Sequence, residues 1–171
     1  MLRLIFKVHA DLAKIVEREF SSVAVGGTFD EFHKGHRALI RKAFDVGGRV
    51  LIGLCTDEFA RKIWKQHRIS AYERRLEELR EFLAKEGVLN RAEIMPLDDP
   101  YGVTLSRDCV EAIVVSRETE PVAREINILR KQRGLPPLEV IVIQMVPAEN
   151  HVAISTTRIR RGEIDKEGHM L

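Results

Sequence analysis

Hydrophobic residues in this chain gather into short runs, separated by longer segments in which they recur every three or four positions. The runs have the length of strands and contain few polar residues, which is typical of a parallel sheet that helices cover on both faces. We therefore predict five buried strands, over residues 22–25, 49–55, 92–97, 112–115 and 140–143.

The segments between these runs carry the start and stop signals of helices. Ser70-Ala71-Tyr72-Glu73 has the spacing of a capping box, Pro121 suits the first turn of a helix, and Ser155 is a typical N-cap residue. Gly87 and Gly134 suit the ends of helices. The predicted helices cover residues 37–44, 57–64, the stretch between Ser70 and Gly87, 119–132 and 155–160.

The order of these elements predicts the fold class. From Ser22 onward the order is β-α-β-α-α-β-β-α-β-α. Right-handed crossovers fold it into an α/β, doubly wound, Rossmann-like three-layer sandwich with a mainly parallel five-stranded sheet. We predict one domain over residues 22–171 and an N-terminal extension, residues 1–21, whose role the pattern leaves open. Within the extension, residues 2–8 favour an edge strand and residues 11–20 a helix.

Composition and charge favour a small-molecule partner. The 171 residues, 44% of them hydrophobic, suffice for one substantial core. The net charge of +2 comes from 28 basic and 26 acidic residues that are interspersed, which argues against a nucleic-acid or membrane partner. No apolar run approaches the roughly 20 residues of a membrane span, and Lys7, His9 and Asp11 interrupt the N-terminus, unlike a signal peptide. We expect a cytoplasmic protein, either a monomer or a small homo-oligomer.

The two cysteines, Cys55 and Cys109, are far apart in the chain. A disulfide framework or a zinc site calls for more cysteines at closer spacing. We therefore expect two buried, reduced thiols.

The segment from Val25 to His36, Val-Gly-Gly-Thr-Phe-Asp-Glu-Phe-His-Lys-Gly-His, joins the first predicted strand to its helix. Gly26 and Gly27 permit a tight turn, and His33 and His36 are spaced to share a face of the first helical turn. Unpaired N–H groups and the positive end of the helix dipole favour an anion there. The alternative is a pair of solvated surface histidines; zinc is disfavoured because no cysteine pair accompanies them.

Three consecutive hydroxyl residues, Ser155, Thr156 and Thr157, precede Arg158 at the start of the last predicted helix. Hydroxyls, helix N–H groups and a guanidinium together predict a second phosphate-binding site. Ordinary N-capping, the alternative, needs only one of these hydroxyls.

A further polar segment, Ser116-Arg117-Glu118-Thr119, follows the fourth predicted strand, and Arg124, Asn127 and Arg130 come after it. A strand that ends in polar residues ahead of a helix can present backbone groups to a base and hydroxyls to a ribose. A capped helix on a solvated surface has the same pattern, so both interpretations stay open.

The residues from Gly27 to His36 match Gly-Thr-Phe-Asp-x-x-His-x-Gly-His. This segment resembles the signature of the HxGH nucleotidyltransferase superfamily, which implies that a nucleoside triphosphate is joined to an acceptor phosphate with release of pyrophosphate. Class I aminoacyl-tRNA synthetases share the histidine pair, but this chain is too short for one and has no Lys-Met-Ser-Lys-Ser loop.

Six segments together resemble the archaeal and eukaryotic type of phosphopantetheine adenylyltransferase. The resemblance runs from about Ser22 to Asp165. It implies transfer of AMP from ATP to 4'-phosphopantetheine, which gives dephospho-coenzyme A and pyrophosphate in coenzyme A biosynthesis. The segments are Gly26–Asp30, Thr56–Ala60, Tyr72–Leu76, Asp99–Gly102, Val114–Thr119 and Ser155–Asp165.

One departure from that family keeps related substrates open. Residues 154–157 read Ile-Ser-Thr-Thr, the form common in cytidylyltransferases, but residues 150–153 lack the Arg-Thr-Glu-Gly that usually precedes it there. The alternatives are an FMN adenylyltransferase, an alcohol-phosphate cytidylyltransferase, or a nucleotide-sensing module without turnover. A nicotinamide mononucleotide enzyme is disfavoured, since such enzymes usually read Gly-Arg-Phe-x-Pro where this chain has Gly-Thr-Phe-Asp at 27–30.

By the same resemblance, the acceptor phosphate attacks ATP in line, and the protein contributes position and charge rather than a nucleophile. His36 is expected on the α-phosphoryl group, His33 on the triphosphate and Thr28 on the acceptor phosphate. Lys62 is the expected catalytic lysine after the second strand, with Lys65 as the alternative.

Tyr101, with Thr28 and Lys62, completes the expected acceptor site. Mg²⁺ is the expected cofactor, bound mainly through the phosphates of ATP and without a protein ligand. The expected ATP-binding residues are Gly26, Gly27, Gly35, Ser116, Arg117, Glu118, Thr119, Ser155, Thr156, Thr157 and Arg158.

Overall fold

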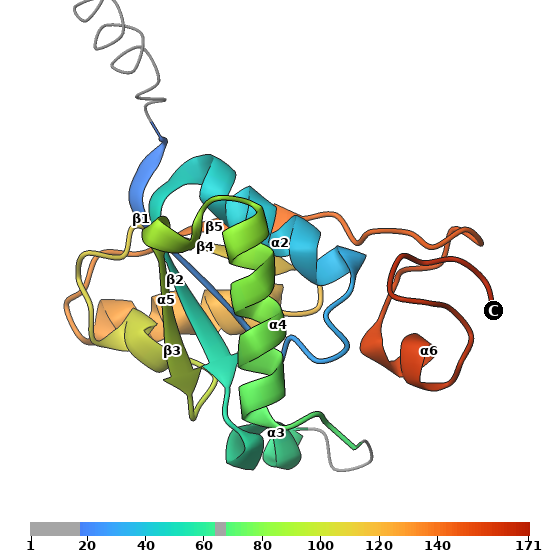
Figure 1. Ribbon diagram of the computed structural model, residues 1–171. Coiled ribbons are helices and arrows are strands. Elements are labelled where there is room, and N and C mark those ends of the chain that lie inside the picture. The colour runs from blue at the N-terminus through green and yellow to red at the C-terminus, as the bar shows by residue number, and fades with distance from the viewer. Residues whose placement is uncertain (1–17, 64–67) are drawn as a thin grey trace, which may run out of the picture.

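The computed structural model describes residues 18–63 and 68–171, and a parallel sheet forms its centre (Figure 1). Neighbouring strands pair in parallel throughout, in the order β3-β2-β1-β4-β5. The sequence prediction of five strands is confirmed, and the sheet is wholly rather than mainly parallel. The strands are β1 (Phe20–Gly27), β2 (Gly47–Cys55), β3 (Ala92–Leu97), β4 (Ala112–Ser116) and β5 (Glu139–Ile143).

Helices follow the strands in the predicted order, with two short 3-10 turns added. Figure 1 shows α4 in front of the sheet and α5 behind it, which gives the three layers of a doubly wound fold. The helices are α2 (Lys34–Val46), α3 (Asp57–Ile63), α4 (Tyr72–Lys85), α5 (Glu120–Gln132) and α6 (Thr156–Arg160), and the 3-10 turns are η1 (Leu89–Arg91) and η2 (Gly102–Leu105).

Alternation along the central strand divides the core between the two faces of the sheet. Val23 and Val25 point into a cluster with Ile40 of α2 and Leu79 of α4. Ala24, one position away, points into a second cluster, which includes residues of α5 and η2. Successive side chains of a strand point to opposite faces, so a strand buried on both sides reads as an unbroken hydrophobic run.

The strand order reverses between β1 and β4, because β2 follows β1 on one side and β4 lies on the other. Parallel sheets bind ligands outside the carboxyl ends of the strands at such a reversal. The β1–β4 ladder pairs only Val23 with Ala112 and Ala24 with Ile113, although both strands continue beyond these residues. The topology therefore places the end of β1 beside the end of β4, where a ligand site is expected.

The turn after β1 departs from the sequence prediction. Gly26 and Gly27 are the last residues of the strand and do not form the tight turn. Positive φ angles occur instead at Phe29 (49°) and Glu31 (47°), neither of which is glycine. Left-handed backbone is unfavourable for these residues, so packing around them must hold the turn in shape.

Other differences concern the N-terminus of α4, the first strand and one cysteine. Ala71 is the N-cap of α4, and no side chain caps it, so the predicted capping box at Ser70 is wrong. Phe20 begins β1 rather than ending a helix. Cys55 is buried as expected, whereas Cys109 is exposed; both thiols are free. Arg18 and Glu19, which also fall in the helix predicted over residues 11–20, are not helical. Residues 11–17, the predicted strand over residues 2–8, Trp64 and Lys65 lie outside the described residues.

Residues 144–171 form a separate small cluster after β5. Ala148, Ile154 and Ile164 are buried together in it, and α6 lies between the last two of these residues. Figure 1 shows this red segment beside the start of α2, and the backbone N–H of Lys34 donates to the carbonyl of Lys166 (2.9 Å). Across the described ranges, no helix is long and apolar enough to cross a membrane.

Candidate active site

His33 and His36 cap the N-terminus of α2 reciprocally. His33 is the N-cap residue, and its Nδ1 accepts from the backbone N–H groups of Gly35 (3.1 Å) and His36 (3.4 Å). The backbone N–H of His33 in turn donates to Nδ1 of His36 (3.5 Å). The two rings stack with their centroids 3.7 Å apart. This is a capping box built from two imidazoles, where Ser or Thr and Glu or Gln are the usual partners.

These contacts fix which nitrogen of each ring carries the proton. Because Nδ1 accepts a hydrogen bond in both rings, each neutral imidazole bears its proton on Nε2. Burial, then the positive charges of Arg37 and Lys166, lower the pKa of His33 to about 4. Burial, then His33 and Arg37, hold the pKa of His36 well below its usual value. At neutral pH the pair is two uncharged Nε2–H donors.

Aromatic rings hold His36 in place. Phe29 meets it edge to face with centroids 5.4 Å apart, and Phe32 stacks on it at 6.0 Å. Phe29 is completely buried, although its φ is positive, and a Cβ at Gly27 would contact its ring at 3.4 Å. The two phenylalanines of the turn therefore orient the imidazole of His36, while Thr28 stays partly exposed.

Gly35 lies directly against the ring of His33. A Cβ at this position would come within 3.0 Å of the His33 ring carbon Cε1 and 3.1 Å of Nδ1. Contacts this short force the neighbour to move. The glycine between the two histidines is thus required by the position of the imidazole.

The structure brings the two predicted phosphate-binding segments together. Thr156 Oγ1 donates to the carbonyl of Asp30 (3.1 Å), across 126 residues of sequence. Arg160 binds the Asp30 carboxylate through Nε (3.0 Å) and Nη2 (2.7 Å). The hydroxyl-rich start of α6 therefore lies beside the turn that carries His33 and His36.

The hydroxyls at this helix start are not equivalent. Ser155 caps α6, and its Oγ accepts from the backbone N–H of Arg158 (3.4 Å), which leaves its own O–H free to donate. Thr156 already uses its O–H on Asp30. Ser155 and Thr157 are thus the better placed donors for a bound anion.

Arg158 has a use that the sequence did not predict. Its Nη1 donates to the carbonyls of Val152 and Ala153 (both 3.0 Å), Nη2 donates to Asn150, and Nε pairs with Glu163 (3.1 Å). The guanidinium is mostly buried by these groups. It fixes the loop before α6 rather than projecting toward a ligand.

At the end of β4, the polar segment closes into a turn. The backbone N–H of Ser116 donates to Thr119 Oγ1 (3.2 Å), and the N–H of Thr119 donates to the carbonyl of Ser116 (3.1 Å). Arg117, Glu118 and Thr119 are exposed. The turn borders the strand reversal, but its side-chain hydroxyls bond mainly to one another.

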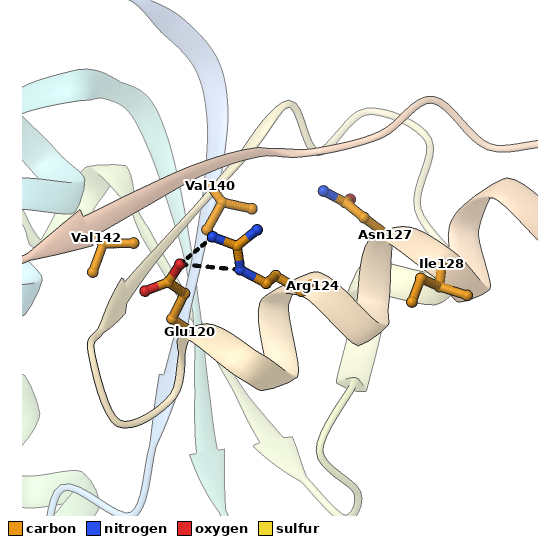
Figure 2. Close-up of a pocket in the computed structure, with 6 residues that line it drawn as sticks. All are labelled: Glu120, Arg124, Asn127, Ile128, Val140 and Val142. Carbon is orange, nitrogen blue, oxygen red and sulfur yellow. Dashed lines mark hydrogen bonds and ion pairs between the residues drawn. The ribbon is translucent and has the colours of Figure 1, made fainter.

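Of the three polar residues that follow this turn along α5, Asn127 and Arg130 serve the fold, whereas Arg124 is exposed. Arg124 pairs with Glu120 (3.0 Å), and Asn127 exchanges hydrogen bonds with the backbone of Leu138. Arg130 is fully buried and donates to four backbone carbonyls. Figure 2 shows Arg124 and Asn127 lining a hollow of about 380 Å³ between α5 and the edge strand β5, two strands away from β1.

Lys62 lies on α3, after β2 as expected, and its side chain is 65% exposed. Its Nζ pairs with Glu58 (2.7 Å), one helical turn earlier. An exposed pair of this kind is weak, so the ammonium can leave it for a bound phosphate at little cost.

Tyr101 lies at the mouth of a small cavity of about 50 Å³ between the strand ends and the 98–104 loop. Its hydroxyl donates to Glu125 of α5 (2.9 Å), and its backbone N–H to Asp99 (2.7 Å), which fixes the loop. The cavity lining is mostly apolar and includes Gly26, Leu97, Pro100, Tyr101 and Val103.

The sequence did not predict a role for Asp30 or Arg160, whose ion pair joins the histidine turn to α6. Asp30 was part of the matched motif but received no role, and only the fold shows that it faces α6. Within the described parts of the chain, no group of three or more histidine, cysteine or acidic residues is arranged to hold a metal ion.

Comparisons with known proteins agree with this geometry. The cytidylyltransferase-like family model matches residues 24–162. A phosphopantetheine adenylyltransferase of Methanothermobacter thermautotrophicus is 52% identical over 91% of this chain and 93% of its own length. One of Pyrococcus horikoshii is 43% identical over 89% and 96%.

Among solved structures, a protein of unknown function from Archaeoglobus fulgidus matches with a TM-score of 0.65 and 33% identity, over 72% of this chain and 98% of that one. The residues that the family model matches include the histidine pair and the hydroxyl-rich turn before α6. The chain belongs to the phosphopantetheine adenylyltransferases, within the cytidylyltransferase-like family.

Proposed function

We propose that the protein transfers the adenylyl group of ATP to 4'-phosphopantetheine, giving dephospho-coenzyme A and pyrophosphate. The observation that carries this proposal is the pair of uncharged, mutually capped histidines held beside the hydroxyl-rich start of α6. The names of the relatives supply the acceptor, since the two in Methanothermobacter and Pyrococcus are phosphopantetheine adenylyltransferases.

The reaction is a single displacement at phosphorus. An oxygen of the acceptor phosphate attacks the α-phosphorus of ATP, the bond to the bridging oxygen breaks, and pyrophosphate leaves with that electron pair. Negative charge grows on the α-phosphoryl oxygens, where preorganised donors are most effective. The Nε2–H of His36 supplies such a donor, and His33 directs its own toward the triphosphate.

Uncharged imidazoles suit this task. A charged histidine would bind the highly negative ground state strongly, whereas a fixed neutral donor stabilises charge where it develops without itself losing a proton. The capping contacts hold both rings before substrate arrives, so the donors need little reorganisation.

The triphosphate lies, in this proposal, between the N-terminus of α2 and the start of α6. Ser155 and Thr157 donate hydroxyls to it, and the positive end of the α2 dipole attracts it. The unpaired N–H groups expected at this helix start are absent among the residues that the structure describes, because the N–H of Lys34 donates to Lys166 and those of Gly35 and His36 donate to His33. The adenosine lies at the strand reversal, against the backbone of Gly26 and Gly27 and the turn from Ser116 to Thr119.

The acceptor lies on the other side of the α-phosphate. Thr28, at the end of β1, orients the acceptor phosphate, and Lys62 adds positive charge after leaving Glu58. The apolar cavity beside Tyr101, of about 50 Å³, has room for only a small part of the uncharged arm of the acceptor. A magnesium ion held mainly by the phosphates of ATP would offset part of the negative charge of the triphosphate.

We place this activity in the cytoplasm, with no nucleic-acid or membrane partner, in a monomer or small homo-oligomer. The near balance of interspersed basic and acidic residues supports this view.

The deciding experiment incubates the purified protein with Mg-ATP and, separately, 4'-phosphopantetheine, FMN or nicotinamide mononucleotide, and measures pyrophosphate. Release with 4'-phosphopantetheine alone is expected. A parallel series replaces ATP by CTP, because the Ile-Ser-Thr-Thr sequence at residues 154–157 is also common in cytidylyltransferases. Release with FMN only, or with CTP in preference to ATP, would overturn the proposal.

A further inference from the structure

A buried arginine gathers the ends of the first two strands. Arg75, on the first turn of α4, is 1% exposed. Its Nη1 donates to the carbonyls of Thr28 (2.9 Å) and Cys55 (2.8 Å), and its Nε donates to the carbonyl of Ser70 (2.8 Å). Its Nη2 pairs with the carboxylate of Asp57 (2.7 Å). One guanidinium thus holds the last residue of β2 and the residue after β1 at the acceptor side of the site.

Ser70 also contacts a second ion pair, formed by Asp30 and Arg160. The backbone N–H of Ser70 donates to Asp30 Oδ1 (3.1 Å), and the Asp30 residue is 2% exposed. Arg160 of α6 binds both oxygens of that carboxylate, and its Nη2 also reaches Ser70 Oγ (3.5 Å). We call Thr28, Asp30, Ser70, Arg75 and Arg160 the Ser70 junction.

The junction runs without a break from the acceptor side to the triphosphate side. At one end the carbonyl of Thr28 is held by Arg75, and at the other Arg160 lies on the helix that Ser155 caps. Both amide groups of Ser70 are used, the N–H on Asp30 and the carbonyl on Arg75.

The Ser70 junction neutralises charge at the carboxyl end of the sheet. Carbonyl oxygens at the carboxyl end of a parallel sheet carry negative partial charge toward the place where phosphates bind. Arg75 occupies two of them and brings a positive charge beneath the site. Charged groups taken out of water are costly to leave unpaired, so the ends of the junction cannot shift independently.

We propose that Arg75 and Arg160 are positioning residues that act through Ser70 to hold Thr28 and α6 in one geometry. Occupation of the triphosphate side thereby orders the acceptor side. The kinetic part of this inference rests on the proposed function. Neither arginine needs to touch a substrate for this role.

The first test compares Arg160→Lys with Arg161→Lys. Arg161 is a matched control, because it is the C-cap residue directly after Arg160, its side chain is 67% exposed, and its Nη1 lies 3.8 Å from the carboxylate of Glu163. Lysine keeps the charge but cannot bind both oxygens of Asp30 in the same way. We expect Arg160→Lys to lower kcat about 100-fold with little change in either KM, as for a misplaced catalytic group. Arg161→Lys is expected to behave as wild type.

A raised KM for ATP with unchanged kcat would overturn the proposal, since that pattern marks a direct contact with ATP. Equal behaviour of the two variants would overturn it as well. If Arg160→Lys does not fold, Asp30→Asn is compared with Arg161→Lys in its place. Asparagine keeps the shape of the aspartate side chain and weakens the pair between residues 30 and 160.

A second test needs no acceptor and so separates this inference from the proposed function. Amide hydrogen exchange of residues 68–75 is measured with and without a non-hydrolysable ATP analogue. Binding should slow exchange there in the wild type and in Arg161→Lys, and the slowing should vanish in Arg160→Lys. Slowing that persists in Arg160→Lys would overturn the junction. Lack of pyrophosphate release by the wild type would instead count against the proposed function.

Discussion

The backbone N–H of His33 donates to Nδ1 of His36, and Nδ1 of His33 accepts from the backbone N–H of His36, so each residue fixes the ring of the other. The arrangement caps the start of α2 and sets the tautomer of both rings at the same time. Both Nε2–H groups remain available to a ligand.

Replacement of His36 by alanine should remove the donor nearest the α-phosphoryl group. We expect kcat for pyrophosphate release to fall about 100- to 1,000-fold, the usual effect of losing one preorganised donor. His169→Ala is the matched control, since His169 is exposed and pairs only with Asp165 in the same segment. A His36→Ala enzyme that is folded, as judged by circular dichroism, and turns over at the wild-type rate would contradict the assignment.

The low pKa values of the histidine pair predict how the protein responds to acid. The pKa of folded His33, about 4, lies below the ordinary value of 6.5, so the unfolded chain binds more protons between these values. The free energy of unfolding should therefore fall as the pH drops from about 6.5 to 4, and the pair should not limit activity above that range.

Ring resonances followed by NMR check this prediction within one spectrum. His33 and His36 should stay neutral at pH 5.5. His169 serves as the internal reference, because the hydrogen bond to Asp165 raises its pKa and it titrates above its usual range. A titration midpoint of His33 near 6.5 would show that its ring is not buried beside Arg37 and Lys166 in solution.

Gly35→Ala tests the packing between the histidines. Alanine favours a helix by up to about 1 kcal/mol over glycine, but its Cβ would meet the His33 ring at 3.0 Å. We expect kcat to fall while thermal stability changes little, because the imidazole must move to make room. Unchanged kcat would mean that the ring position of His33 is not critical.

Arg158→Met separates support of a loop from contact with ATP. The guanidinium holds two carbonyls and Glu163, so we expect a loss of about 2 kcal/mol in the free energy of unfolding. The KM for ATP should rise little at a temperature where the variant is folded. A large increase in that KM with wild-type stability would restore Arg158 to the ATP site.

Lys62→Met should raise the KM for the acceptor and lower kcat, since the ammonium is proposed to leave Glu58 for the reacting phosphates. Arg61→Met, one position away on α3, is the control. Equal kinetics of the two variants would exclude Lys62 as the catalytic lysine.

The sequence predicted the strands, the helices and their order because hydrophobic spacing records local geometry and burial. It also singled out two segments, Gly27–His36 and Ser155–Thr157, that the structure brings side by side. The predicted capping box at Ser70 is wrong for a physical reason. The backbone N–H of Ser70 donates to the side chain of Asp30, forty residues earlier, and a local sequence pattern cannot indicate such a contact.

The positive φ angles at Phe29 and Glu31 could not be predicted either. The sequence favoured Gly26 and Gly27 for the turn, because glycine adopts such angles most easily, but the packing around Phe29 and Glu31 determines where the turn forms. The pairing of Asp30 with Arg160 spans 130 residues, and single-sequence periodicity carries no information at that distance. The position of Lys62 relative to the histidines depends in the same way on tertiary structure.

The bond between Asp30 and Arg160 also bears on how the protein is made. Asp30 leaves the ribosome early, yet its partner is added only after 130 further residues have been joined. Until then the carboxylate of Asp30 lacks the guanidinium of Arg160, and α6 has not been synthesised. The chain therefore cannot acquire activity in stages during translation, and competence for catalysis arrives only once α6 has docked.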